Sequence, residues 1–140
     1  MSNRLIGLDY GKKRIGIALS DPLNITAQAH SYLENNANTL PSLKKLADEY
    51  DIDTIIIGLP KNQFGQDSPM AEEVRIFAKK LENELGLNIE FWDERYSSAA
   101  VTKHLIAANV SRKKRKKIID SSAAAFILQG YLDNISLKNN

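Results

Sequence analysis

The sequence predicts a single α/β domain built on a five-stranded mixed sheet with helices on both faces. Two apolar strands separated by a glycine-containing turn lie near the amino terminus, which is typical of an antiparallel hairpin. Further along, strand-like apolar runs alternate with segments whose apolar residues recur at helical spacing. This succession is typical of a mixed sheet covered on both sides. The 140 residues suffice for one core and are few for two, so we expect one domain over 1–140.

The first half of the chain supplies three strands and one helix. Residues 4–9 and 14–20 are expected to form the two arms of a hairpin around Gly11, and a third strand is expected near 27–33. Residues 39–50 carry apolar side chains at helical spacing and a proline in the first turn, which favours a helix.

The second half continues the alternation of strands and helices. A buried strand is expected at 54–57. A helix then follows Ser68 as its N-cap, with Pro69 at its first position, and Gly86 ends it. The next strand covers 88–94. Two more helices are expected at 98–108 and 119–133.

Composition excludes several classes of protein. Apolar residues make up 43% of the chain and charged residues 26%, which is typical of a soluble globular protein. The longest strongly apolar stretch, 55–59, is far below the ~18 residues that a membrane span needs, and no signal-like apolar region precedes the first strand. The lack of cysteine excludes thiolate metal sites and leaves oxygen ligands. We therefore expect a cytoplasmic protein with no membrane partner.

Positive charge is concentrated in one short segment. The net charge is +2, from 19 basic and 17 acidic residues, but six basic residues follow one another without an acid. The rest of the chain has 13 basic against 17 acidic residues, a net charge of about −4. Such a run is either a solvated loop or a contact for a polyanion, and its unbroken length favours the polyanion. Its members are Arg112, Lys113, Lys114, Arg115, Lys116 and Lys117.

Three acids stand at the ends of predicted elements in apolar surroundings. Asp9 closes the first strand, Glu94 closes the strand 88–94, and Asp120 opens the last helix. Asp120 shares a helical face with the residues four, seven and eleven positions later, which are alanine, isoleucine and tyrosine. A carboxylate on a core-facing side needs a hydrogen-bond donor or a metal. The three acids therefore suggest a divalent metal site.

Several other residues have two interpretations each. Lys13, Arg14 and Arg95 either clamp phosphates or pair with neighbouring acids. Phe91 and Trp92 either stack on bases or belong to the core, which is the commoner place for aromatic residues in a strand.

Two glycines of the first hairpin, Gly7 and Gly16, allow a close approach to one face of the sheet. Either a nucleic-acid backbone or a packed helix could make this close approach to the sheet. The residues themselves do not distinguish the two.

Four segments follow one another in a recognisable order: 8–21, Gly-Leu-Pro at 58–60, Asp-Glu-Arg at 93–95, and 120–132. Together they span nearly the whole chain and resemble the YqgF (RuvX) family. The resemblance implies a ribonuclease H-like fold, and members of that family are described as Holliday junction resolvases or as nucleases that mature the 5′ end of 16S ribosomal RNA. One loop departs from the pattern: the family commonly has Asn-Met-Asp-Gly there, whereas Gln63, Phe64 and Gly65 follow Asn62 here.

The resemblance implies catalytic and metal-binding roles for Asp9, Glu94 and Asp120, the same acids that the residue pattern singles out. Two Mg²⁺ or Mn²⁺ ions about 4 Å apart assist hydrolysis of a phosphodiester by water, and such hard ions bind carboxylates. We expect Asp9 to bridge the two ions, with Glu94 and Asp120 each binding one. Nucleic acid is expected to contact Lys13, Arg14, Arg95 and the run 112–117.

The expected function is a metal-dependent endonuclease that matures the 5′ end of 16S ribosomal RNA, with the ribosomal small subunit as a partner. A Holliday junction resolvase is the alternative, and it would need a dimer to make two symmetric cuts. The sequence is compatible with a monomer or a weak homodimer. Two interpretations are less favoured: a nonenzymatic RNA-binding assembly protein, and a phosphate-binding domain like those of actin, sugar kinases and related chaperone ATPases, which need two such domains to enclose a nucleotide.

Overall fold

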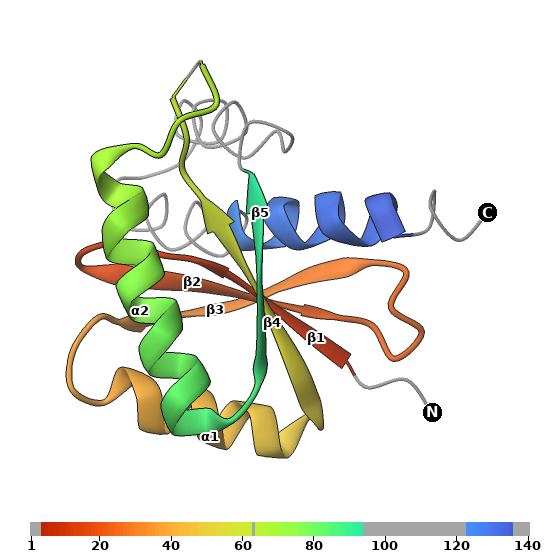
Figure 1. Cartoon of the computed structure of the whole chain (residues 1–140). Coiled ribbons are helices and arrows are strands. Elements are labelled where there is room, and N and C mark those ends of the chain that lie inside the picture. The colour runs from red at the N-terminus through yellow and green to blue at the C-terminus, as the bar shows by residue number, and fades with distance from the viewer. Residues whose placement is uncertain (1–3, 63, 94–122, 136–140) are drawn as a thin grey trace, which may run out of the picture.

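The computed structural model of the chain describes residues 4–62, 64–93 and 123–135 (Figure 1). A last helix, residues 123–135, is called the C-terminal helix here. The elements before it are β1 (Arg4–Asp9), β2 (Arg14–Ser20), β3 (Ala27–Glu34), α1 (Thr39–Glu49), β4 (Ile52–Leu59), α2 (Pro69–Leu85) and β5 (Asn88–Asp93).

The five strands form one mixed sheet in the order β3-β2-β1-β4-β5. β2 pairs antiparallel with β1 and with β3, whereas β4 pairs parallel with β1 and with β5. This topology confirms the predicted hairpin and the predicted five-stranded mixed sheet. Because β1, β4 and β5 run in the same direction, their carboxyl ends, at Asp9, Leu59 and Asp93, meet at one edge of the sheet.

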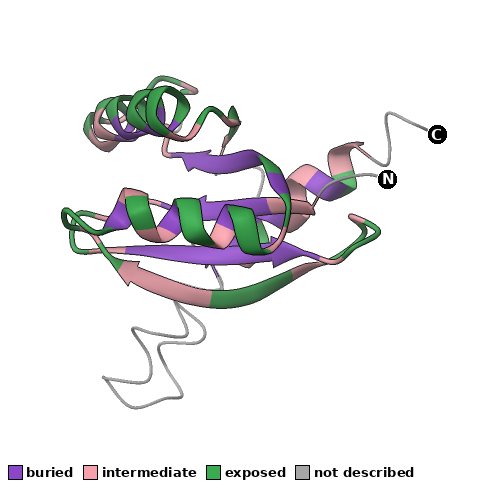
Figure 2. Ribbon diagram, turned by 90° about the horizontal axis from the view of Figure 1, so that it is seen from below, coloured by how far each residue is buried: buried purple, intermediate pink, exposed green. Residues whose placement is uncertain are grey.

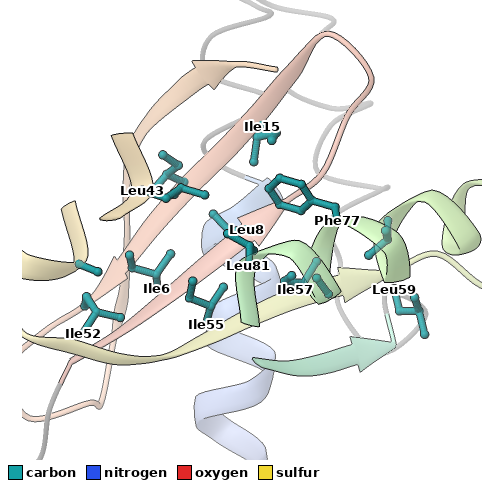
Figure 3. Close-up of a cluster of buried hydrophobic side chains, with 14 of the residues drawn as sticks. Ile6, Leu8, Ile15, Leu43, Ile52, Ile55, Ile57, Leu59, Phe77 and Leu81 are labelled. Atoms are coloured by element: carbon teal, nitrogen blue, oxygen red, sulfur yellow. The ribbon is translucent and has the colours of Figure 1, made fainter. Parts of the chain in front are cut away.

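Helices cover both faces of the sheet, as predicted. On one face, α1 and α2 enclose a core of aliphatic and aromatic side chains (Figure 3). On the other face, the C-terminal helix packs against a smaller buried cluster. Buried residues are concentrated in the central strands β1, β2 and β4, and the outward sides of α1 and α2 are exposed (Figure 2). None of the helices in the described part of the chain is long and apolar enough to cross a membrane.

The observed elements agree with the predicted ones to within a few residues. The strand predicted at 54–57 is longer and runs over Ile52–Leu59, and the last helix is described from 123 to 135. The predicted helix at 98–108 and residues 119–122 lie outside the described residues.

α2 begins and ends at the predicted residues. Ser68 is its N-cap, but the Ser68 hydroxyl donates to the carbonyl of Pro60 at 2.8 Å instead of accepting from the helix. Gly86 ends the helix with φ of 68°, a left-handed conformation that glycine adopts without strain. The loop before α2 is therefore tied to the end of β4, and this fixes where the loop leaves the sheet.

Candidate functional site

Asp9 is a buried carboxylate at the edge where the parallel strands end. It is the last residue of β1 and is 7% exposed. Side chains alternate along a strand, and Ile6 and Leu8 lie in the α1/α2 core, so Gly7 and Asp9 face the side of the C-terminal helix. A carboxylate buried this deeply is stable where donors or cations satisfy it. Asp9 is thus a buried acid at the carboxyl end of β1, on the side of the C-terminal helix.

The register of the strands shows what stands beside Asp9. Leu8 pairs with Ile57, so the next residues of these parallel strands, Asp9 and Gly58, are level. Gly58 pairs in turn with Trp92. Asp9 and Trp92 thus lie in one row across the sheet, and Gly58 between them contributes no side chain to either face.

The C-terminal helix approaches closely at Gly7, two residues before Asp9. A Cβ atom added at Gly7 would lie 2.7 Å from the Cβ of Leu128 and 3.0 Å from the carbonyl oxygen of Ala124. The packed helix, rather than a nucleic-acid backbone, therefore occupies the opening over Gly7. The face predicted to carry Asp120 does turn toward the sheet, since Ala124 and Ile127 are fully buried.

Of the three predicted metal ligands, Asp9 alone falls within the described residues. Glu94 and Asp120 lie outside them, as do Arg95 and the basic run 112–117. Residues 4–62, 64–93 and 123–135 contain no group of three or more His, Cys, Asp or Glu that could hold a metal ion. The carboxylate triad stays a prediction.

Lys13 and Arg14 lie in and just after the turn between β1 and β2, at the same edge as Asp9. The turn is tight, because a Cβ at Gly11 would lie 2.5 Å from the carbonyl oxygen of Arg14. Asn35 braces it by donating from its side-chain amide to the Gly11 carbonyl at 2.8 Å. Lys13 is exposed, whereas Arg14 is partly buried with its guanidinium 5.8 Å from the ring centre of Tyr32. Of the two, Lys13 is the more accessible to a phosphate.

Trp92 belongs to the core beneath the C-terminal helix. Its ring meets Tyr131 edge-on, with centroids 6.3 Å apart, and a Cβ at Gly130 would lie 2.8 Å from the indole nitrogen. Tyr131 donates its hydroxyl to Glu90 at 2.6 Å. Burial and the Glu90 carboxylate both raise the pKa of Tyr131. Packing in the core is thus the correct interpretation for Trp92.

Phe91, one residue earlier on β5, faces the opposite side of the sheet from Trp92. Phe91 is 37% exposed, and its ring lies under the guanidinium of Arg75 in α2, whose carbon is 5.2 Å from the ring centre. Its exposed edge is therefore on the α2 side, away from the face that carries Asp9.

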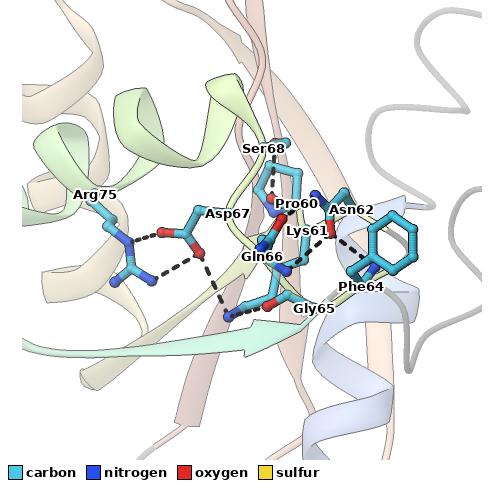
Figure 4. Close-up of polar contacts among 9 residues, drawn as sticks. All are labelled: Pro60, Lys61, Asn62, Phe64, Gly65, Gln66, Asp67, Ser68 and Arg75. Atoms are coloured by element: carbon cyan, nitrogen blue, oxygen red, sulfur yellow. Dashed lines mark hydrogen bonds and ion pairs between the residues drawn. The ribbon is translucent and has the colours of Figure 1, made fainter.

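A polar network in the loop between β4 and α2 was not predicted. Asp67 accepts from Arg75 Nε at 2.8 Å and pairs with Lys61 Nζ at 3.5 Å (Figure 4). The hydrogen bond from Arg75, with the charges of Arg75 and Lys61, holds the pKa of Asp67 below its usual value. An acid flanked by basic residues six positions before and eight after could have indicated this network, but only a fold that bends the chain back brings all three together.

The sheet order, the helices on both faces and the acid that ends the first strand define a ribonuclease H-like fold. Two solved structures share it over nearly their whole length. Thermus thermophilus RuvC in complex with a Holliday junction substrate gives a TM-score of 0.59 at 10% identity, with 96% of each chain covered. Fowlpox virus resolvase with Holliday junction DNA gives 0.54 at 15% identity, covering 94% of this chain and 98% of that one. At these identities the likeness concerns the fold.

The chain belongs to the RuvX family, whose model is described as "Holliday junction resolvase" and matches residues 3–134. Curated relatives from Clostridium botulinum and Clostridium beijerinckii are each 47% identical to it. The alignments cover 95% and 96% of this chain and 98% and 99% of those proteins. Both relatives carry the name "Putative pre-16S rRNA nuclease". Family membership agrees with the expected enzyme class, a hydrolase of phosphodiester bonds.

Proposed function

We propose that this protein is a metal-dependent endonuclease that matures the 5′ end of 16S ribosomal RNA in the cytoplasm. The observation that carries the reaction is Asp9, a buried carboxylate where three parallel strands end. The substrate is supported by relatives that are 47% identical over nearly their full length and are named for the ribosomal RNA precursor.

The proposed metal site combines Asp9 with two acids that adjoin described elements. Glu94 follows Trp92 by two residues and Asp120 precedes Ala124 by four, so continuation of β5 and of the C-terminal helix would put both acids on the Asp9 side of the sheet. Mg²⁺ takes one or two protein carboxylates together with water and phosphate oxygens, so three carboxylates suffice for two ions that share one of them. When bound, two such ions stabilise the attacking and the leaving oxygens of the phosphodiester. Asp9, at the centre of the edge, is the proposed bridging ligand.

Contacts with the nucleic acid are proposed to come from basic residues around that edge. Lys13 is exposed in the turn that follows Asp9, and Arg14, Arg95 and the run 112–117 would add further charge. Phosphate contacts fix the position of a nucleic acid but do not read its bases. The choice of cleavage site would therefore come from the shape of the precursor or from the ribosomal small subunit.

Resolution of Holliday junctions is the second candidate. It is favoured by the description of the family and by the fold shared with two resolvases. A resolvase makes two symmetric cuts and works as a dimer. RNA processing ranks first because the relatives at 47% identity bear the name of a nuclease of ribosomal RNA.

Side-by-side cleavage assays distinguish these functions. Labelled 16S precursor RNA and a four-way DNA junction are each incubated with the protein and Mg²⁺, Mn²⁺ or EDTA. We expect metal-dependent cleavage of the precursor near the mature 5′ end, with little turnover of the junction. Paired symmetric cuts in the junction alone would make the protein a resolvase. Failure to cut either substrate with either metal would refute the nuclease proposal, and an ATP hydrolysis control tests the kinase-like alternative.

A further inference from the structure

The loop between β4 and α2 presents an aromatic side chain to solvent. Phe64 is 76% exposed, the largest value among the exposed large hydrophobic residues of the described chain. Its ring points away from the Arg75–Asp67 ion pair at the base of the loop (Figure 4).

The backbone that carries Phe64 is fixed by hydrogen bonds inside the loop. The side-chain oxygen of Asn62 accepts from the backbone N–H groups of Phe64 at 2.9 Å and Gln66 at 3.0 Å. The backbone N–H of Asn62 donates to Gln66 at 2.8 Å, and that of Gly65 donates to Asn62 at 3.0 Å. Gly65 makes the turn with φ of 81°. Because these bonds already hold the backbone at Phe64, binding of a partner through its ring needs little further ordering of the backbone.

The charged side chains of the described loop lie at its base, where two cations share one carboxylate. Lys61 and Asp67 form an isolated β-bridge as well as an ion pair, and Arg75 binds the same carboxylate. Asn62, Phe64, Gly65 and Gln66 in the described tip are uncharged. A neutral tip that combines amides with one exposed ring suits the flat, polar-edged surface of a nucleobase better than it suits a phosphate.

The loop leaves the sheet at the edge where Asp9 lies. Asp9 is level with Gly58, and the loop begins two residues later at Pro60, just past the end of β4. It projects beyond the end of the sheet at the top of Figure 1. A nucleic acid bound over this edge, as the proposed function requires, would pass beside the loop.

We propose that Phe64 stacks on an unpaired nucleobase next to the bond that is cut and so positions the strand at the metal site. This inference rests on the proposed function and identifies a positioning residue for it. Stacking accepts any base but needs a base that is free of a neighbour on one side. Phe64 would therefore favour a single-stranded or distorted segment beside a duplex over a continuous duplex.

The test compares Phe64→Ala, Phe64→Leu and Phe64→Trp with wild type. Binding is measured on 16S precursor RNA that carries 2-aminopurine, a base whose fluorescence is quenched by stacking. The 2-aminopurine is placed at successive positions around the cleavage site. A four-way junction labelled in the same way is the second substrate. Binding is measured in Ca²⁺ and cleavage in Mg²⁺. Leu23→Ala is the matched control, because Leu23 is 74% exposed and lies in the β2–β3 turn at the opposite end of β2 from the turn beside Asp9.

We expect Phe64→Ala and Phe64→Leu to weaken RNA binding about tenfold, the size of one base–aromatic stack. The same two variants should raise KM more than they lower kcat, and they should abolish quenching at one 2-aminopurine position. Phe64→Trp should keep RNA binding, KM and quenching near wild type. Leu23→Ala should change none of these three quantities. The melting temperature should not move in any Phe64 variant, since the ring is exposed.

Each outcome separates this inference from the proposed function. Wild-type cleavage of the RNA with unchanged binding and quenching in Phe64→Ala would overturn the stacking role and leave the nuclease standing. Phe64-dependent quenching without cleavage would show that Phe64 stacks on a base, but it would refute the nuclease and with it the positioning role. Quenching on the junction alone would assign the base to branched DNA, and absence of binding to either nucleic acid would overturn both proposals.

Discussion

The two faces of the sheet are built from alternate residues of the same strands, yet they differ in the size of their side chains. Toward α1 and α2, β1, β2 and β4 direct large aliphatic residues such as Ile6, Leu8 and Ile57. Toward the C-terminal helix, β1 directs Gly7 and Asp9, and of the two residues level with Gly7, Ala18 is small and Ile56 is large. One face thus carries the larger core, and the other carries a smaller buried cluster under a single helix.

Along β1, residues that stabilise the core therefore alternate with residues on the face of the proposed site. Large side chains remove the most apolar surface from water and so contribute most to the free energy of folding. Small residues contribute less, but they let the C-terminal helix approach the sheet backbone beside Asp9. The proposed site therefore lies on the face that contributes less to stability, and adjacent residues of β1 are expected to respond to substitution in opposite ways.

The largest effect is expected for Asp9→Asn. Loss of a ligand that bridges two ions should lower the cleavage rate at least about a thousandfold, because the metals supply several kcal/mol of transition-state stabilisation. Without metal, the melting temperature should be equal or higher, since crowded carboxylates repel one another. The variant should also lose the stabilisation that Mg²⁺ gives to the folded wild type. Cleavage assays and thermal melts with and without metal measure these changes.

Leu8→Ala is the matched control on the other face of β1. Leu8 is fully buried, so its truncation should cost about 2–5 kcal/mol of unfolding free energy, while cleavage per folded molecule stays near wild type. If Asp9→Asn instead melted several degrees lower without metal and still cleaved RNA, Asp9 would be a structural residue and the metal site would be wrong at that position.

A smaller effect is expected for Gly7→Ala, which adds a methyl group where the C-terminal helix packs against β1. The added Cβ would lie 2.7 Å from the Leu128 Cβ, so the C-terminal helix must move away. Overpacking of this kind costs about 1–3 kcal/mol. Urea unfolding should show a loss larger than that of Ile6→Val, which removes one methyl group from the larger core. Equal stability of Gly7→Ala and wild type would show that the C-terminal helix does not pack closely against Gly7.

The smallest effect is expected for Tyr131→Phe, and it depends on pH. The folded-state pKa of Tyr131 is raised by burial and by Glu90, so the phenol contributes stability below the unfolded value of about 10 and loses it as pH rises above that value. At neutral pH, loss of the hydrogen bond to Glu90 should cost at most about 1 kcal/mol. Urea unfolding between pH 8 and 11 should show the wild-type advantage shrinking. An advantage that stayed constant would exclude this linkage.

Local patterns in the sequence determined the elements of this fold. The alternation of apolar residues predicted the strands, because successive side chains of a strand point to opposite faces. Helical spacing and the signals at Ser68, Pro69 and Gly86 predicted α2 with its observed ends. The position of Asp9 at the end of β1 followed from the same local signals. Each of these depends on residues that are neighbours in the chain.

Tertiary structure decided what those elements contact. The sequence left Gly7 open to a nucleic acid or a helix, and packing of Leu128 against it selected the helix. Gln129 accepts from the N–H of Ala27 and donates to the carbonyl of Ile25, joining the C-terminal helix to a turn about a hundred residues earlier. Periodicity specifies which face of an element is apolar, but it carries no information about which distant residue will meet that face. The order of the strands brings such residues together.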